Sequence, residues 1–134
     1  GAVGLLSGLE KPDDQLHRYG VIKERHQGNH AYLEDFVEKP APGTAPSNLI
    51  NISKYILTPT ALDYVDNVQC GNKSGEYYIT DAVLACAKNH PVAVHRAGGR
   101  FLDAGSLAGW LEANIILAEA NPDLKNVLQQ AHKG

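Results

Sequence analysis

The sequence predicts a layered α/β fold. Short apolar runs of strand length alternate with amphipathic helical patterns, and turn residues such as Pro and Gly separate them. The chain has 134 residues, of which 43% are hydrophobic and 20% charged, a composition that suits a globular domain with its own core. No internal repeat, low-complexity segment or clear boundary to a second domain interrupts the pattern.

The expected strands are bounded by turn residues. A Pro12-Asp13-Asp14 cluster follows the first strand, and a turn over residues 26–30 (His-Gln-Gly-Asn-His) separates the second from the third. The fourth, Leu49–Leu57, is a long run of mainly apolar residues after a loop rich in Pro, Gly, Ser and Thr. The expected strands cover residues 2–8, 19–23, 31–38, 49–57, 91–97 and 100–102.

The expected helices begin at capping residues. Thr58 before Pro59 has the form of an N-cap followed by Pro at the first helical position, and Thr80, Ser106 and Asn121 precede further helices. The helices cover residues 59–67 and 81–89, and two more follow Ser106 and Asn121. After Ser106 the 3, 4, 7, 8 spacing of apolar residues predicts one buried face, formed by Leu107, Trp110, Leu111, Ile115 and Ala118.

Charge and hydropathy argue against two classes of partner. The net charge of -3 gives no electrostatic basis for binding nucleic acid or an anionic membrane. No apolar run approaches the roughly 20 residues that are needed to cross a bilayer. We therefore expect neither nucleic acid nor membrane as a partner.

The cysteines and histidines give no metal pattern. Cys70 and Cys86 lack metal-type spacing, so reduced thiols in a cytoplasmic protein are expected. His26 and His30 are four residues apart, but Gly28-Asn29 between them argues against a helix and no third ligand is near. No metal site is expected at these histidines.

One strand ends at Glu38-Lys39-Pro40, where an acid and a base precede a residue that cannot continue the ladder. Ligands of open α/β sheets bind at the carboxyl ends of strands. A carboxylate accepts hydrogen bonds from sugar hydroxyls, and an ammonium is a compact partner for phosphate. The pattern indicates a contact with a sugar phosphate, and a solvated charge pair is the alternative.

Asp103 follows an apolar segment and precedes Gly105 and the capping residue Ser106. A carboxylate in such a turn can hold Mg²⁺ through oxygen, and the helix amino terminus favours anions. The alternative is that Asp103 only caps the helix. Glu76 and Asp81 have a preferred structural interpretation. We expect Glu76 to lie in a loop and Asp81 in the first turn of the helix that follows, where negative charge is favoured.

Several short segments occur in a specific order and spacing. They are residues 18–22 (Arg-Tyr-Gly-Val-Ile), 36–40 (Phe-Val-Glu-Lys-Pro), 45–49 (Ala-Pro-Ser-Asn-Leu), 75–76 (Gly-Glu), 79–81 (Ile-Thr-Asp), 103–106 (Asp-Ala-Gly-Ser), 109–110 (Gly-Trp) and 113–114 (Ala-Asn). Together they resemble the bacterial UTP–glucose-1-phosphate uridylyltransferases, which are sugar-1-phosphate nucleotidyltransferases. The resemblance runs from about Leu16 to Ala118.

The resemblance implies roles for four residues. Gly20 matches a glycine whose backbone approaches the sugar, and Glu38 matches the carboxylate that holds sugar hydroxyls. Lys39 matches the lysine that neutralises the sugar phosphate. Asp103 matches the second of two aspartates that bind Mg²⁺. Lys39 and Asp103 are thus the expected catalytic residues, Gly20, Glu38 and Lys39 the expected substrate contacts, and Asp103 the expected metal ligand.

The same resemblance implies the fold and the reaction. It implies a Rossmann-like nucleotidyltransferase fold with a mixed central sheet flanked by helices. It also implies nucleotidyl transfer from UTP to glucose 1-phosphate, giving UDP-glucose and pyrophosphate, with Mg²⁺ as cofactor and a homo-oligomeric whole enzyme. The alternatives are a non-catalytic paralogue or regulatory subunit, or an enzyme for another sugar such as N-acetylglucosamine 1-phosphate, whose uridylyltransferases Tyr77-Tyr78 resembles.

One part of the family pattern is not found in the sequence. The family begins with a glycine-rich nucleotide loop ending Gly-Thr-Arg and carries its first metal aspartate before the region seen here, and neither occurs in these 134 residues. We therefore expect residues 1–134 to be the carboxyl-terminal, sugar-phosphate-binding part of a nucleotidyltransferase domain. Without the amino-terminal nucleotide-binding part, they should be inactive alone.

Overall fold

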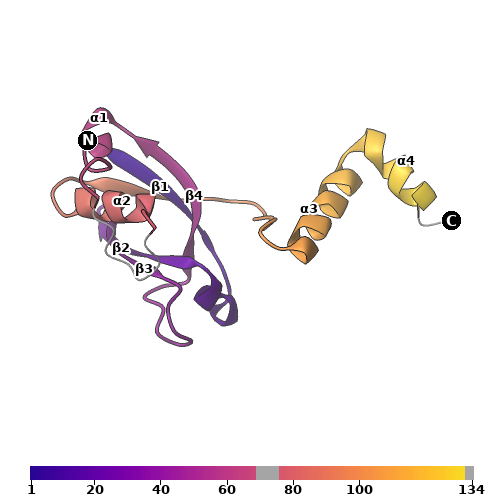
Figure 1. Cartoon of the computed structure of the whole chain (residues 1–134), viewed down its shortest axis with the longest axis horizontal. Coiled ribbons are helices and arrows are strands. Elements are labelled where there is room, and N and C mark those ends of the chain that lie inside the picture. The colour runs from indigo at the N-terminus through magenta and orange to yellow at the C-terminus, as the bar shows by residue number, and fades with distance from the viewer. Residues whose placement is uncertain (69–75, 132–134) are drawn as a thin grey trace. The chain divides into compact units, whose positions relative to one another are not determined.

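The computed structural model describes residues 1–68 and 76–131. The chain divides into two compact units, Gly1–Gly98 and Gly99–Gly134, and each is described by itself. Within the described residues the first unit carries the strands and two of the α-helices, and the second carries α3 and α4 (Figure 1).

The first unit is built on a mixed sheet, as expected. Its strands close on themselves in the order β1–β4–β2–β3–β5. β5 runs parallel to β1, and the other neighbours are antiparallel. The elements are β1 (Gly4–Glu10), the 3₁₀ helix η1 (Asp13–Arg18), β2 (Gly20–Gln27), β3 (His30–Glu38), β4 (Leu49–Leu57), α1 (Pro59–Leu62), α2 (Ile79–Ala87) and β5 (Val92–Arg96).

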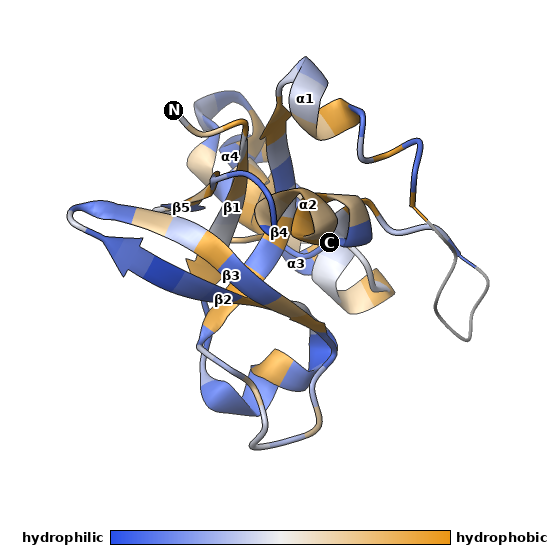
Figure 2. Cartoon of the chain, turned by 90° about the vertical axis from the view of Figure 1, so that its left-hand side faces the viewer, coloured by the Kyte–Doolittle hydropathy of each residue, from blue (hydrophilic) through white to orange (hydrophobic). Residues whose placement is uncertain are grey.

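β2 and β3 form a hairpin around Gly28-Asn29. Gly28 has a φ of 59°, the left-handed conformation that tight hairpin turns require and that glycine adopts without steric cost. The hairpin extends beyond the rest of the sheet and its tip is hydrophilic (Figure 2). β2 is therefore longer than the predicted strand 19–23, because its polar end is stabilised by pairing with β3 rather than by burial.

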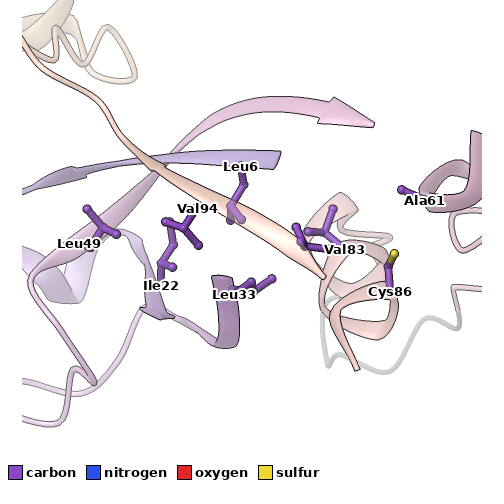
Figure 3. Packing of buried hydrophobic residues seen from close by; sticks show 9 residues of the cluster. Leu6, Ile22, Leu33, Leu49, Ala61, Val83, Cys86 and Val94 are labelled. Atoms are coloured by element: carbon purple, nitrogen blue, oxygen red, sulfur yellow. The ribbon is translucent and has the colours of Figure 1, made fainter. Parts of the chain in front are cut away.

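Apolar side chains from the sheet pack against the two helices to form the core. Leu6, Ile22 and Leu49 are almost fully buried, and α2 contributes Val83 and Cys86 (Figure 3). Burial raises the pKa of the Cys86 thiol, so this side chain behaves as a small apolar group. Cys86 is a free thiol, and Cys70 lies outside the described residues.

Two predicted elements of the first unit differ from the structure. The helix expected over residues 59–67 ends at Leu62, and turns continue to residue 67. Thr58 does not cap it, because its hydroxyl donates to the Val3 carbonyl at 2.6 Å. The helix expected over residues 81–89 begins at Ile79, so Thr80 lies inside its first turn instead of capping it.

The second unit contains α3 (Leu107–Ala120) and α4 (Pro122–Ala131), which contact each other. Ser106 caps α3 as predicted, since its hydroxyl accepts the Gly109 N–H at 3.1 Å. The expected apolar face is not buried: Leu107 and Trp110 are 83% and 52% exposed, and Ala113 is the buried residue of the helix.

Residues 100–102 do not form the predicted strand. A strand needs a hydrogen-bonding neighbour, and in the part of the chain that the structure describes the five strands pair among themselves. None of the described helices is both long and apolar enough to pass through a bilayer.

Arg96, at the end of β5, forms hydrogen bonds with side chains of two other strands, β1 and β2. Its Nε and Nη2 donate to Glu24 Oε1 on β2 at 3.1 and 2.7 Å, and Nη1 donates to Glu10 on β1. The Glu24 side chain is only 6% exposed, and its Oε1 also lies 2.8 Å from His26 Nε2. These bonds raise the pKa of Arg96, and the Glu24 contact contributes most.

We predict that Arg96→Met lowers the free energy of unfolding by about 2 kcal/mol, because it leaves the buried Glu24 carboxylate without its cation while Arg96 itself is partly screened by water. Urea denaturation followed by circular dichroism measures this. Lys23→Met is the control, since Lys23 pairs with Glu34 and both side chains are exposed. An equal loss in the two variants would contradict the role of Glu24 burial.

Candidate functional site

Gly20 and Glu38 face each other across the β2–β3 hairpin, where they are partners in the ladder. A Cβ atom on Gly20 would lie 2.8 Å from Glu38 Oε2 and would overlap the Phe36 ring. Only glycine therefore lets the carboxylate lie over the β2 backbone. The Glu38 carboxylate and the Phe36 ring therefore both lie against the Gly20 backbone, and the Glu38 side chain is 50% exposed.

Lys39 follows directly and has an unusual backbone. Its φ is 45°, a left-handed conformation that costs a non-glycine residue on the order of 1 kcal/mol. Its N–H donates to the Tyr19 carbonyl at 3.1 Å, and the next residue, Pro40, is buried. The Lys39 Nζ lies 4.0 Å from Glu38 Oε1, which is too far for a hydrogen bond. An exposed acid and base therefore stand together at the end of β3.

Asp103 belongs to the second unit. Its Oδ1 accepts the Gly105 N–H at 3.0 Å, and a Cβ on Gly109 would overlap the Asp103 carbonyl oxygen. The loop that holds Asp103 is thus fixed against the first turn of α3 by a glycine. The alternative that Asp103 caps this helix is wrong, because the capping side chain is Ser106.

The donor chemistry of Asp103 fits Mg²⁺. This ion is usually held by one or two carboxylates together with substrate phosphates and water. Residues 1–68 and 76–131 contain no group of three or more His, Cys, Asp or Glu side chains that could hold a metal ion. Asp103 can therefore supply one ligand of a site that other groups complete. His26 instead has its Nε2 2.8 Å from Glu24 Oε1.

The acidic residues around the start of α2 make local contacts that stabilise this segment. The Tyr78 hydroxyl donates to Glu76 Oε2 at 2.6 Å, and Asp81 lies in the first turn of the helix, where negative charge is favoured. Ser74 and Gly75 of the same motif lie outside the described residues. Tyr77 is 71% exposed.

Asn51 and Tyr55 on β4 are two polar residues that the sequence analysis did not select. Asn51 Nδ2 donates to the Tyr55 hydroxyl at 2.6 Å. Burial raises the pKa of the Tyr55 hydroxyl; the hydrogen bond from Asn51 opposes this shift, and the negative charge of Glu38 adds to it. Tyr55 is therefore within electrostatic reach of Glu38. In the sequence, the one indication of this polar pair was the amide side chain of Asn51 inside the mainly apolar run 49–57.

A cavity of about 260 Å³ lies between η1 and the loop that follows Lys39. It is lined by Asp13, Leu16 and His17 of η1 and by Ala41, Pro42, Gly43, Ala45 and Ser47 of the loop. Gly20, Glu38 and Lys39 do not line it. The structure thus brings Gly20, Glu38 and Lys39 together at the end of the hairpin, and the hollow formed by the loop is a neighbouring feature.

Known proteins identify the family. The model of the nucleotidyl transferase family matches residues 1–120. This chain belongs to that family. The mixed sheet with helices packed on it, as expected from the sequence, is the fold of its solved relatives.

The similar proteins share one description. The UTP–glucose-1-phosphate uridylyltransferase of Staphylococcus haemolyticus is 36% identical over 120 residues, which cover 89% of this chain and 41% of that protein. A UDP-glucose pyrophosphorylase solved with UDP-glucose is 31% identical, with a TM-score of 0.77 over 88% of this chain and 45% of the other. A UTP-bound UGPase from Acinetobacter baumannii is 26% identical, with a TM-score of 0.80 over 96% of this chain and 44% of the other. The chain spans about two fifths of the curated relatives it matches.

Proposed function

We propose that this chain is the carboxyl-terminal, sugar-phosphate-binding part of a UTP–glucose-1-phosphate uridylyltransferase. The observation that carries the proposal is the close approach of Glu38 to Gly20, with Lys39 directly after it. The printed names of the similar proteins support UTP and glucose 1-phosphate as substrates. UDP-glucose and pyrophosphate are then the products.

The residues of the first unit would bind and orient the sugar phosphate. The phosphate oxygen of glucose 1-phosphate attacks the α-phosphorus of UTP, and the bond from that phosphorus to the pyrophosphate oxygen breaks. Both reactants are anions, so positioning and neutralisation of charge supply most of the catalysis. Glu38 accepts hydrogen bonds from the sugar hydroxyls above Gly20, and the Lys39 ammonium neutralises the sugar phosphate.

Asp103 would hold Mg²⁺ together with an aspartate outside this chain. When bound, the ion neutralises the charge of the phosphates. Asp103 keeps its own position through the Gly105 N–H and the close approach of Gly109. The proposal includes a homo-oligomeric whole enzyme, for which exposed Leu124 and Val127 on α4 offer apolar surface. A cytoplasmic location stays a prediction.

The test is pyrophosphate release from UTP with glucose 1-phosphate or N-acetylglucosamine 1-phosphate. We expect the whole enzyme to prefer glucose 1-phosphate, and residues 1–134 alone to show no turnover above background, because they lack a glycine-rich phosphate loop. Comparable turnover by residues 1–134 would contradict this division of roles. Preference for the N-acetylated sugar would support the other specificity, and sugar binding without turnover would support a non-catalytic paralogue.

We predict that Lys39→Gln lowers kcat/KM for glucose 1-phosphate by about 30- to 1,000-fold, which corresponds to the loss of about 2–4 kcal/mol from a charge-assisted phosphate contact. Gln keeps most of the side-chain length and meets a similar backbone cost at a φ of 45°. Steady-state kinetics measures this, with Lys54→Gln, an exposed lysine of β4, as control. Rates within threefold of the wild type would reject the role of Lys39.

We predict that Asp103→Asn lowers Mg²⁺-dependent turnover at least about 100-fold while the fold stays stable, because Asn keeps an oxygen for the Gly105 N–H but loses the charge a hard cation needs. Titration of turnover with Mg²⁺ and a thermal melt measure the two effects. Asp123→Asn, in the first turn of α4, is the control. An active variant that melts much earlier would indicate a purely structural role.

A further inference from the structure

β4 contains an irregularity opposite β1. Ser7 pairs with Lys54, but the next residue, Gly8, pairs with Asn51, so Ile52 and Ser53 have no partner in β1. Ser53 has a φ of 56°, a left-handed conformation that is unfavourable for a residue other than glycine. Bulges of this kind redirect a side chain and are frequent beside functional sites.

The bulge fixes the orientation of one amide. The Ser53 N–H donates to Asn51 Oδ1 at 3.0 Å, so the Nδ2 of the same amide points toward Tyr55 and donates to its hydroxyl oxygen at 2.6 Å. A tyrosine hydroxyl that accepts this bond still has its own proton to donate. Asn51 thus directs the Tyr55 proton away from itself.

The ladder places this pair on the same face as the carboxylate of Glu38. Gly20 pairs with Glu38 and Val21 pairs with Ile50, so the continued antiparallel register puts Asn51 opposite Gly20. Side chains directly opposite each other in a ladder lie on one face. Glu38 and Asn51 therefore flank Gly20, against which the Phe36 ring also lies, and they are about two strand spacings, or roughly 10 Å, apart.

Tyr55 lies on this face too. It pairs with Leu6, while Asn51 pairs with Gly8, and these two β1 residues are two positions apart and share a face. The ring is half-buried against the core, and its hydroxyl oxygen lies 2.6 Å from Asn51 Nδ2. Because burial and the Glu38 charge raise the pKa of this hydroxyl, it is protonated at neutral pH and acts as a donor.

We propose that the Tyr55 hydroxyl, oriented by Asn51, donates a hydrogen bond to one hydroxyl of the hexose that Glu38 holds, and that this contact selects the sugar. This inference rests on the proposed function. The ionised Glu38 carboxylate can only accept hydrogen bonds, whereas a sugar hydroxyl both donates and accepts. Tyr55 supplies the missing donor on the opposite side of Gly20, and Asn51 is a positioning residue that acts through it.

The test uses the whole enzyme with UTP and a series of sugars: glucose 1-phosphate and its 2-, 3-, 4- and 6-deoxy analogues. Tyr55→Phe should lower kcat/KM for glucose 1-phosphate about three- to tenfold, mainly through KM, because one neutral hydrogen bond is lost. KM for UTP should not change. For one analogue, the one that lacks the contacted hydroxyl, Tyr55→Phe should have no effect.

Asn51→Val distinguishes positioning from packing, since Val removes the amide but is an apolar residue that strands accommodate well. It should reproduce the loss seen with Tyr55→Phe and add nothing to it in the double variant. Tyr64→Phe is the matched control, because it removes a hydroxyl from another half-buried tyrosine, one that lies edge-on to His90. This control should leave all five sugars unchanged.

The outcomes separate the two proposals. A whole enzyme that makes no UDP-glucose would overturn the proposed function itself. An active enzyme in which Tyr55→Phe changes nothing, or lowers kcat/KM equally for every sugar, would overturn the role of Tyr55 alone. Additive losses for Asn51→Val and Tyr55→Phe would overturn the positioning role of Asn51.

Discussion

The register of β2 against β3 is the constraint on which the candidate site depends. Side chains alternate between the faces of a strand, so a slip of one residue would move Glu38 to the opposite face and separate it from Gly20. The two-residue turn at Gly28-Asn29 sets the register near the tip, and an irregularity between Lys23 and Glu24 shifts it by one residue into the Gly20–Glu38 pairing. The Lys39 N–H bond to Tyr19 continues this pairing at the other end. Both ends of the hairpin therefore determine where the acid and base stand.

The same face of the sheet changes from apolar to polar along its length. Ile22 and Leu49 are fully buried, and two positions further along their strands lie Gly20 and Asn51. Because the core residues hold the strands rigidly, the polar residues that follow them are fixed without packing of their own. This arrangement lets a half-exposed carboxylate such as Glu38 keep a defined position and still meet a ligand.

The acidic residues of the chain have different roles for electrostatic reasons. Glu24 is almost fully buried and its carboxylate is bound to Arg96, so it stabilises the sheet. Glu38 is half-exposed and its lysine neighbour is beyond hydrogen-bond distance, so it can exchange water for a ligand. Asp103 accepts a hydrogen bond from the Gly105 backbone N–H, which fixes its position beside the first turn of α3.

The sequence by itself determined the elements whose signals are local. The run Leu49–Leu57 and the Ser106 cap each depend on neighbours a few residues away, and the structure has them where the sequence predicted. The turn predicted over residues 26–30 is shorter in the structure, because pairing of β2 with β3 leaves only Gly28-Asn29 outside the strands. The motif that ends in Glu38 and Lys39 was likewise visible as a charged pair before a proline. Resemblance then supplied the family, which the comparisons show.

Only the tertiary structure decided what depends on distant partners. Thr58 has the sequence context of a helix cap, but its hydroxyl binds Val3, 55 positions away. Residues 100–102 have the composition of a strand but pair with no described strand. Asn51 and Tyr55 read as part of an apolar strand until the bulge at Ser53 and the ladder through Gly20 place them near Glu38. A sequence records local preference, whereas a hydrogen-bond partner across a sheet is fixed by register and packing.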